Sequence, residues 1–198
     1  MKLNLIPIAL LLSLAVGAST ASAQLIAAKD APIAYGHHHL NVTSVAEQKK
    51  FFADTLGGVH VTVAGRENRQ ESKDQKVPVI ANHLHFFGQQ NEEMQAWYVK
   101  VFDAKPGAPG GLFPSANLPG VGLAFSSSPT PTVGTQGRVV DHIGFEMHDL
   151  PAFLKKVEAM GIKPVNVRQV PELNVSIAFI TDPWGTYIEL TDVLRNIQ

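Results

Sequence analysis

Two segments of the chain combine side chains that could carry out chemistry with side chains that could pack in a core. In residues 141–150, alternation along a strand places His142 and Glu146 on one face and hydrophobic residues on the other. In residues 182–190, the same alternation gives Glu189 a face of its own between two aliphatic neighbours. If these two strands are close, an imidazole and a carboxylate converge.

Composition limits the kinds of site that the chain can build. The 198 residues include eight histidines and no cysteine, so a metal ion would have nitrogen and oxygen ligands only. Lysine and arginine number 16 against 17 aspartate and glutamate, and no basic run is present, so nothing indicates nucleic-acid binding. A small-molecule partner is therefore the expectation.

The N-terminal residues 1–23 have the pattern of a secretory signal peptide. Lys2 supplies a positive start, residues 5–16 are an apolar run, and residues 21–23 read Ala-Ser-Ala, a typical cleavage site. The apolar run is short for a bilayer span. We expect export to a periplasmic or secreted location, with a mature chain that begins at Gln24 and has no stable membrane anchor.

The elements that must position these side chains begin with a strand over 35–42, whose polar face includes His37 and His39. A helix follows from Ser44, because Ser44 and Glu47 form a capping-box pattern, and a glycine pair ends it after residue 56. A strand over 58–64 and a charged, solvated loop over 65–76 complete this unit.

The strand and helix then recur at a constant offset of 46 positions, so that His83 and His85 repeat His37 and His39. This is an internal repeat, and a third copy opens at Asp141-His142. The further expected elements are a strand over 81–88, a helix over 92–102, a Pro/Gly-rich connection over 105–119, a strand over 120–126 and a linker over 127–137.

The third copy is the most complete and predicts a βαβββ unit. Asp149 is placed to cap a helix over 150–160, and strands follow over 165–170, 175–181 and 185–190. The chain is thereby divided into a signal peptide (1–23), an N-terminal unit with its charged loop (24–80), a module (81–137) and a C-terminal module (138–198).

The repeated βαβββ pattern, the opening D-H-I-G-F-E-M-x-D-L at 141–150 and the closing D-P-W-G-T-Y-I-E-L at 182–190 resemble the vicinal oxygen chelate superfamily. That superfamily includes glyoxalases, bleomycin-resistance proteins and extradiol dioxygenases. The resemblance implies an α+β fold, in which repeated βαβββ modules form a cupped mixed sheet.

The resemblance also implies a divalent metal ion on the concave face of that sheet, held by a His from the first strand of each module and a Glu from a last strand. By position these ligands are His83, His142 and Glu189, with His37 as the alternative first ligand. Two imidazoles and a carboxylate suit Fe, Mn, Ni, Co or Zn without choosing among them. Glu189 and His85 are the candidate catalytic groups.

The expected function is that of an exported metal-dependent enzyme, a glyoxalase-like lyase or isomerase or a dioxygenase, acting on a small oxygen-chelating substrate. Ring cleavage is the weaker of these, because Phe179 stands where the dioxygenases carry a Tyr. The alternative is a non-catalytic small-molecule binding protein of the bleomycin-resistance type. By analogy a homodimer is expected, and the candidate pocket walls are Trp184, Tyr187, Phe86 and Trp97.

Overall fold

The computed structural model describes residues 32–56, 83–107 and 109–192. The predicted signal peptide, the strand over 58–64 and the charged loop over 65–76 lie outside these residues. Within the described ranges, no helix is long and apolar enough to cross a membrane.

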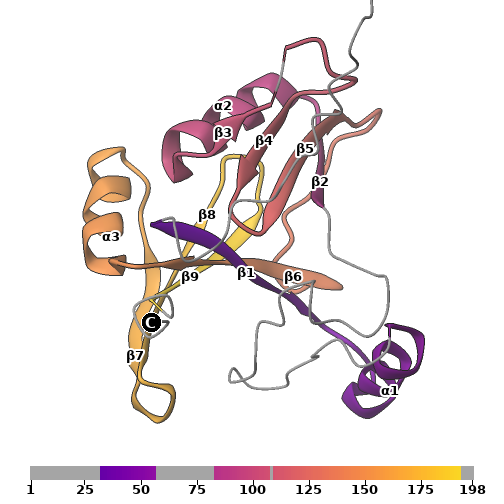
Figure 1. Ribbon diagram of the computed structural model, residues 1–198, viewed down its shortest axis with the longest axis vertical. Coiled ribbons are helices and arrows are strands. Elements are labelled where there is room, and N and C mark those ends of the chain that lie inside the picture. The colour runs from indigo at the N-terminus through magenta and orange to yellow at the C-terminus, as the bar shows by residue number, and fades with distance from the viewer. Residues whose placement is uncertain (1–31, 57–82, 108, 193–198) are drawn as a thin grey trace, which may run out of the picture.

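Two mixed sheets and three α-helices make up the described chain (Figure 1). The sheets have the strand orders β1-β6-β9-β8-β7 and β2-β5-β4-β3. The elements are β1 (Ile33–Leu40), α1 (Val45–Leu56), β2 (His83–Gly88), α2 (Asn91–Phe102), β3 (Lys105–Pro106), β4 (Ser115–Leu118), β5 (Val121–Ser127), β6 (Val140–Met147), α3 (Leu150–Ala159), β7 (Val165–Val170), β8 (Val175–Thr181) and β9 (Tyr187–Thr191).

Two βαβββ units are visible in this order, β2–α2–β3–β4–β5 and β6–α3–β7–β8–β9. In each unit the first strand pairs in parallel with the last, and the remaining pairs are antiparallel. The predicted α+β class with repeated βαβββ modules is confirmed.

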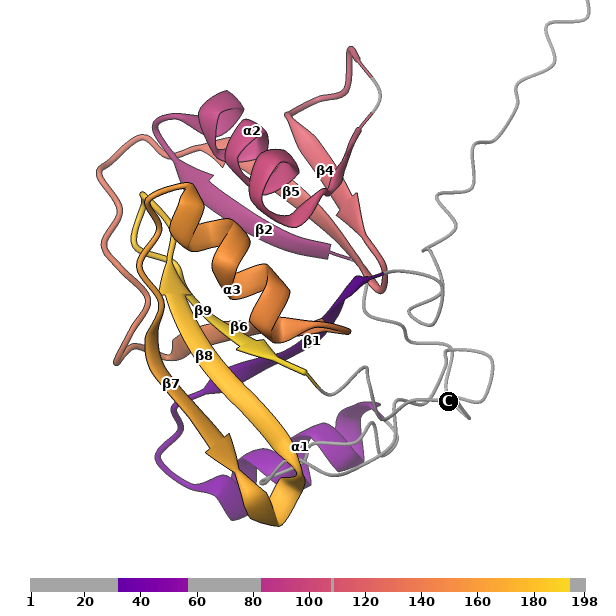
Figure 2. The ribbon, with the colours of Figure 1, turned by 90° about the vertical axis from the view of Figure 1, so that its left-hand side faces the viewer.

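One hydrophobic core joins the two units. Helices α2 and α3 lie side by side across the sheets (Figure 2), and Phe102 of α2 contacts both Phe153 of α3 and Phe145 of β6. On β6, the odd-numbered residues Ile143, Phe145 and Met147 enter this core. The even-numbered residues of β6, including His142, therefore face the other side of the five-stranded sheet.

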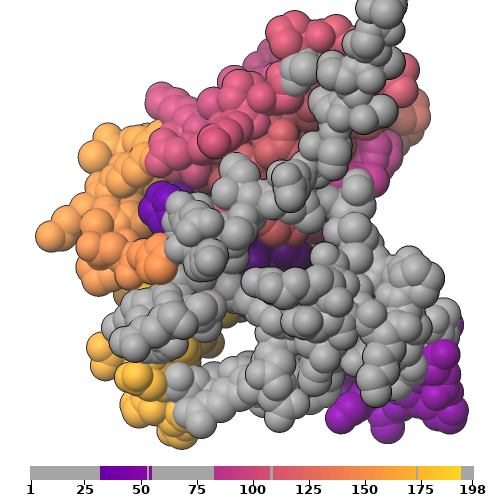
Figure 3. Space-filling view, in the orientation of Figure 1, coloured from indigo at the N-terminus to yellow at the C-terminus, as the bar shows by residue number. Residues whose placement is uncertain are grey.

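Strand β1 occupies a position that the sequence did not predict. It pairs antiparallel with β6 and extends the sheet of the C-terminal unit, whereas we expected the strand of the middle module to supply the first ligand next to that unit. The helix that follows, α1, lies apart from α2 and α3 (Figure 1). In the space-filling view, α1 and β7–β8 occupy opposite lower corners, below the four-stranded unit (Figure 3).

Other element boundaries need small corrections. The predicted connection over 105–119 contains the short strands β3 and β4, because Ala116 and Leu118 pair with β5 and are buried. The last strand is Tyr187–Thr191 rather than 185–190, since the preceding residues form a turn.

Candidate metal centre

His142 lies on a central strand, β6, between β1 and β9. It is 7% exposed and sits on the face opposite the main core. Glu189 reaches the same face from β9, where Ile188 and Leu190 on either side of it enter the core. The register pairs Glu189 with Gly144, two positions after His142, so both side chains rise from neighbouring strands. The predicted convergence of His142 and Glu189 is present.

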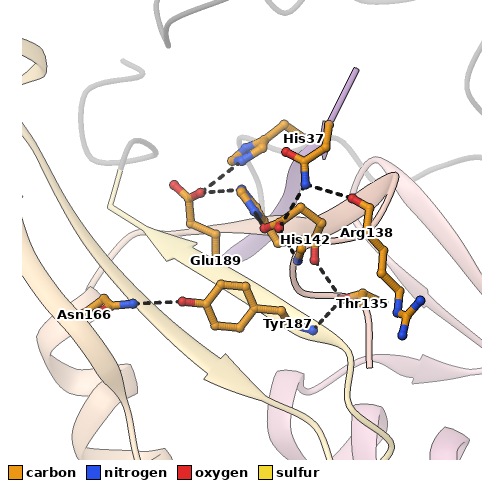
Figure 4. Close-up of polar contacts among 10 residues, drawn as sticks. His37, Thr135, Arg138, His142, Asn166, Tyr187 and Glu189 are labelled. Carbon is orange, nitrogen blue, oxygen red and sulfur yellow. Dashed lines mark hydrogen bonds and ion pairs between the residues drawn. The ribbon is translucent and has the colours of Figure 1, made fainter. Parts of the chain in front are cut away.

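The third member of the cluster is His37 of β1 (Figure 4). Oε2 of Glu189 lies 2.9 Å from Nε2 of His142 and 3.4 Å from Nε2 of His37. One ligand atom from each of the three residues lies within 4.8 Å of the other two. We call His37, His142 and Glu189 the triad.

Two glycines allow His37 to occupy this place. A Cβ atom at Gly144 would lie 2.7 Å from Nε2 of His37 and closer still to two other ring atoms, so the imidazole fills the space that a side chain would take. On the opposing strand, a Cβ atom at Gly36 would lie 2.8 Å from Cγ and Oε1 of Glu146. A side chain at either glycine would require Glu146 or His37 to move, so the two glycines favour the close approach of β1 and β6.

The geometry at His142 suits a shared ligand better than a direct bond. Although its Nε2 is close to Glu189, the contact does not have the angles of a hydrogen bond, and among the described residues this buried nitrogen has no hydrogen-bond partner. A misaligned donor forms only a weak bond, even at a short distance. The nitrogen and the carboxylate are thus close to each other without a well-aligned bond between them.

The charges of the triad reinforce one another when no metal is bound. Burial by itself would raise the pKa of Glu189, but the neighbouring His142 and His37 lower it to about 2. Burial opposes protonation of His142, yet the Glu189 and Asp141 carboxylates outweigh burial and raise the pKa of His142 above 6.5. Glu189 is therefore an anion at neutral pH, as a ligand for a divalent cation should be.

Asp141 contacts the far side of the His142 ring. Its Oδ1 lies 2.8 Å from Nδ1 of His142, and this hydrogen bond holds the pKa of Asp141 below its ordinary value of 3.8. Its Oδ2 accepts hydrogen bonds from the backbone of Gly137 and from the side chain of Asn41.

Beside the triad, an apolar cluster covers the same face of the sheet. Val175, Ile177, Phe179 and Tyr187 form a second group of buried residues, separate from the main core. The ring centroids of Phe179 and Tyr187 are stacked 4.6 Å apart, and the Phe179 and His142 rings are perpendicular with centroids 5.5 Å apart. From the sequence, Phe179 was noted only because it stands where the dioxygenases carry a Tyr. Because it follows Ile177 by two positions on β8, alternation places both side chains on the same face of the strand.

The preferred first ligand, His83, is not part of the triad, whereas the alternative first ligand, His37, is. His83 lies on β2 in the four-stranded sheet. The candidate catalytic residue His85 is on the same strand, where it bonds to Ser126 and stacks on Phe87. Instead, His39 of β1 contacts the triad, with its ring 4.7 Å from that of His142.

Of the four predicted pocket residues, only Tyr187 lies near the triad, 6.2 Å from the His142 ring. Phe86, Trp97 and Trp184 pack in or against the main core instead. Their aromatic character therefore reflects packing between α2 and the sheets, and the indole of Trp184 bonds to Gln90 at the start of α2.

In a comparison with known proteins, the model of one superfamily matches most of the chain. The model of the Glyoxalase/Bleomycin resistance protein/Dioxygenase superfamily matches residues 34–190, a range that includes the whole triad. No curated protein matches the chain.

Among solved structures, the chain is similar to oxidase ChaP-H2, with a TM-score of 0.50 and 15% identity over 59% of this chain and 94% of that one. It is similar to a glyoxalase family protein from Bacillus anthracis, with a TM-score of 0.49 and 15% identity over 60% and 97% of the two chains. For the fosfomycin resistance protein FosX from Listeria monocytogenes the values are 0.46 and 15%, over 57% and 92%. At these identities the likeness concerns the fold alone.

Proposed function

Because the chain belongs to the Glyoxalase/Bleomycin resistance protein/Dioxygenase superfamily, we propose that it is a divalent-metal enzyme whose ion is held by His37, His142 and Glu189. Its substrate is a small molecule with two adjacent oxygen atoms, and its reaction is of the lyase, isomerase or dioxygenase type. The observation that carries this proposal is the convergence of three ligand atoms from three strands within 4.8 Å.

The donor set fits the proposed ion. Two imidazoles and one carboxylate suit Zn, Fe, Mn, Co or Ni and leave coordination positions for a substrate. The buried Nε2 of His142, which has no hydrogen-bond partner among the described residues, would be costly without a ligand. A bound divalent ion supplies Lewis acidity toward substrate oxygens.

Each of three side chains has a separate role at the proposed centre. Glu189 offsets the positive charge of the ion, and the side chain of His37, 40% exposed against 9% for His142, leaves the triad open on the β1 side. His39 is exposed and next to His142, so it is placed to take up or release a proton beside the substrate. We assign to His39 the acid/base role that the sequence suggested for His85.

Metal titration of purified variants tests the proposal. We expect the parent protein to bind one equivalent of Zn(II) or Mn(II), and His37→Ala, His142→Ala and Glu189→Gln to bind it much more weakly. His83→Ala and His148→Ala are the matched controls and should bind like the parent. A parent protein without stoichiometric binding, or a loss in His83→Ala as large as that in His37→Ala, would overturn the assignment.

A second candidate function is binding without turnover. The apolar cluster of Val175, Ile177, Phe179 and Tyr187 beside the triad favours it, because a hydrophobic wall with few polar groups is typical of a small-molecule site. The two functions separate when a ligand found by thermal-shift screening is incubated with the metal-loaded protein. Conversion of the ligand identifies an enzyme, and its full recovery identifies a binding protein.

We also propose that the protein is exported. The charged start at Lys2, the apolar run over 5–16 and the Ala-Ser-Ala of 21–23 support this. N-terminal sequencing of the protein recovered from outside the cytoplasm should begin at Gln24. Recovery of the protein only from the cytoplasm, with an N-terminus at Met1, would contradict export.

A further inference from the structure

We propose that Asp141 is a positioning residue of the centre, which orients His142 and ties together the strands that carry the triad. This inference rests on the proposed metal-binding function, and it assigns to a residue outside the triad the task of presenting Nε2 to the ion. Asp141 is partly buried, with 19% of its side chain exposed, and it directly precedes His142 on β6.

The first oxygen of Asp141 sets the tautomer of His142. Oδ1 lies 2.8 Å from Nδ1 of His142, and an ionised carboxylate can only accept a hydrogen bond. Nδ1 must then carry the proton, which leaves the lone pair on Nε2, the nitrogen that faces Glu189. A carboxylate in this place also restricts rotation of the ring and makes its other nitrogen a better donor to a metal.

The second oxygen of Asp141 fixes the surrounding chain. Oδ2 accepts from the backbone N–H of Gly137 at 2.6 Å and from Nδ2 of Asn41 at 3.3 Å. Asn41 directly follows β1, the strand of His37, and its side chain also donates to the carbonyl of Arg138 at 2.8 Å. One carboxylate therefore connects the end of β1 with the turn that leads into β6.

The same turn reaches the third strand of the triad through Thr135 (Figure 4). The hydroxyl of Thr135 donates to the carbonyl of Asp141 at 2.8 Å and accepts from the backbone N–H of Tyr187 at 2.9 Å. Tyr187 is the first residue of β9, two positions before Glu189. The hydrogen bonds of Asp141 and Thr135 thus link all three strands of the triad, β1, β6 and β9.

Zn(II) titration by calorimetry compares Asp141→Ala and Asp141→Asn with the parent. We expect Asp141→Ala to lose about 10–100-fold in affinity, as is usual when the partner of a metal-ligating His is removed. Asp141→Asn keeps one acceptor oxygen, so it should lose less. The control is Asp149→Ala, which removes an exposed Asp that accepts one backbone hydrogen bond at the start of α3, and should bind like the parent.

A second measurement distinguishes orientation from a general loss of stability. In the metal-free protein at about pH 9, where imidazoles are neutral, long-range ¹H–¹⁵N spectra report the tautomer of each His. We expect His142 to be protonated on Nδ1 in the parent and in Asp141→Asn, and to shift toward Nε2 protonation in Asp141→Ala. The His142→Ala spectrum assigns the signal.

The outcomes are separable. If the parent binds no Zn(II), the proposed function fails, and the tautomer in the metal-free protein still decides whether Asp141 orients His142. Parent-like Zn(II) affinity in Asp141→Ala, or an Nε2–H tautomer in the parent, overturns the role of Asp141. If Asp141→Ala does not fold, Asp141→Asn serves in its place, and a Zn(II) affinity in that variant as high as that of the parent would then overturn the proposal.

Discussion

Gly36 and Gly144 let β1 and β6 approach closely enough for His37 to lie over the strand that carries His142. Each glycine faces a polar side chain of the other strand, Glu146 in one case and His37 in the other. The absence of these two Cβ atoms therefore leaves room for the side chains of Glu146 and His37.

Gly144→Ala should displace the His37 imidazole, because the new methyl group would occupy the position of its ring. We expect the Zn(II) affinity to fall by about tenfold or more, the range seen when the support of a ligand is lost. Isothermal titration measures this directly. Gly161→Ala, at a left-handed position with open space around it, should lower stability while it leaves Zn(II) affinity unchanged.

The metal-free protein should show a stability window set by the triad. The lowered pKa of Glu189 contributes stability that is full above its ordinary value of 4.5 and is lost as the pH falls toward about 2. The raised pKa of His142 contributes stability that is full below 6.5 and is lost as the pH rises above it.

The difference in Tm between the parent and Glu189→Gln should therefore be largest between about pH 4.5 and 6.5, the ordinary values of the two groups. Thermal melts in chelator across this range measure it. His148→Ala, whose exposed side chain is outside the triad, should follow the parent at every pH. A parent–Glu189→Gln difference that is flat with pH would contradict the assignment.

At this scale the sequence predicted two of the three triad residues. His142 and Glu189 follow from alternation along their strands, whereas His37 and His83 are equivalent in the repeat. The sequence does distinguish the two strands at the position before the histidine, where the first copy has Gly36 and the second has Asn82. An Asn at the place of Gly36 would crowd the side chain of Glu146, which favours the strand of His37 beside β6.

Among the elements, the turn between β8 and β9 makes a buried polar connection between the two units. Asp182 is 3% exposed and accepts from the backbone of Trp184 and Thr186, which closes the turn. It also accepts a hydrogen bond from the buried hydroxyl of Tyr98 on α2 at 3.1 Å. Burial disfavours the ionised carboxylate of Asp182 and raises its pKa, so each hydrogen-bond donor around it helps to stabilise the charge.

Tyr98→Phe should lower the free energy of unfolding by about 1–3 kcal/mol, because it leaves a buried carboxylate oxygen with one donor fewer. Urea unfolding followed by circular dichroism measures this change. Tyr35→Phe is the matched control, since the Tyr35 hydroxyl bonds to His38 in an exposed setting, and its effect should be smaller. Equal effects of the two substitutions would argue against a role for the Asp182 contact.

Elements with a strong local pattern were predicted well. The helix over 150–160 is observed at Leu150–Ala159, and Asp149 caps it through the backbone N–H of Ala152. Strands β3 and β4 were missed because their Pro/Gly-rich surroundings indicate a connection. They exist through pairing with β5, which no local pattern encodes.

At the scale of the molecule, the two units share the main core, in which Phe102 of α2 contacts both α3 and β6. Phe102→Ala should cost about 3–5 kcal/mol, as for other buried aromatic side chains. Because its ring touches both α3 and β6, we expect both units to lose stability together and to unfold in one transition. Coincident urea curves from tryptophan fluorescence and far-ultraviolet circular dichroism test this, with the exposed Phe87→Ala as the control.

The fold class could be predicted from the sequence because the βαβββ pattern is local and occurs twice. The partner of β6 could not, because two strands with the same motif compete for one edge and strand pairing is decided by fit over long distances in the chain. The homodimer expected from the resemblance stays a prediction, which light scattering of the purified protein would test.

The pairing of β1 with β6 also bears on the order in which the protein folds. Asn41 and Asp141 are 100 positions apart, whereas β8 and β9 are joined by a short turn. Closing so long a loop costs entropy before its contacts form, so β1 should dock late. After dilution from urea, Zn(II)-binding competence should then lag behind the recovery of helical signal. The ion would stabilise only those chains in which the strand of His37, and not that of His83, has taken the edge of the sheet, which would make metal binding a checkpoint on correct assembly.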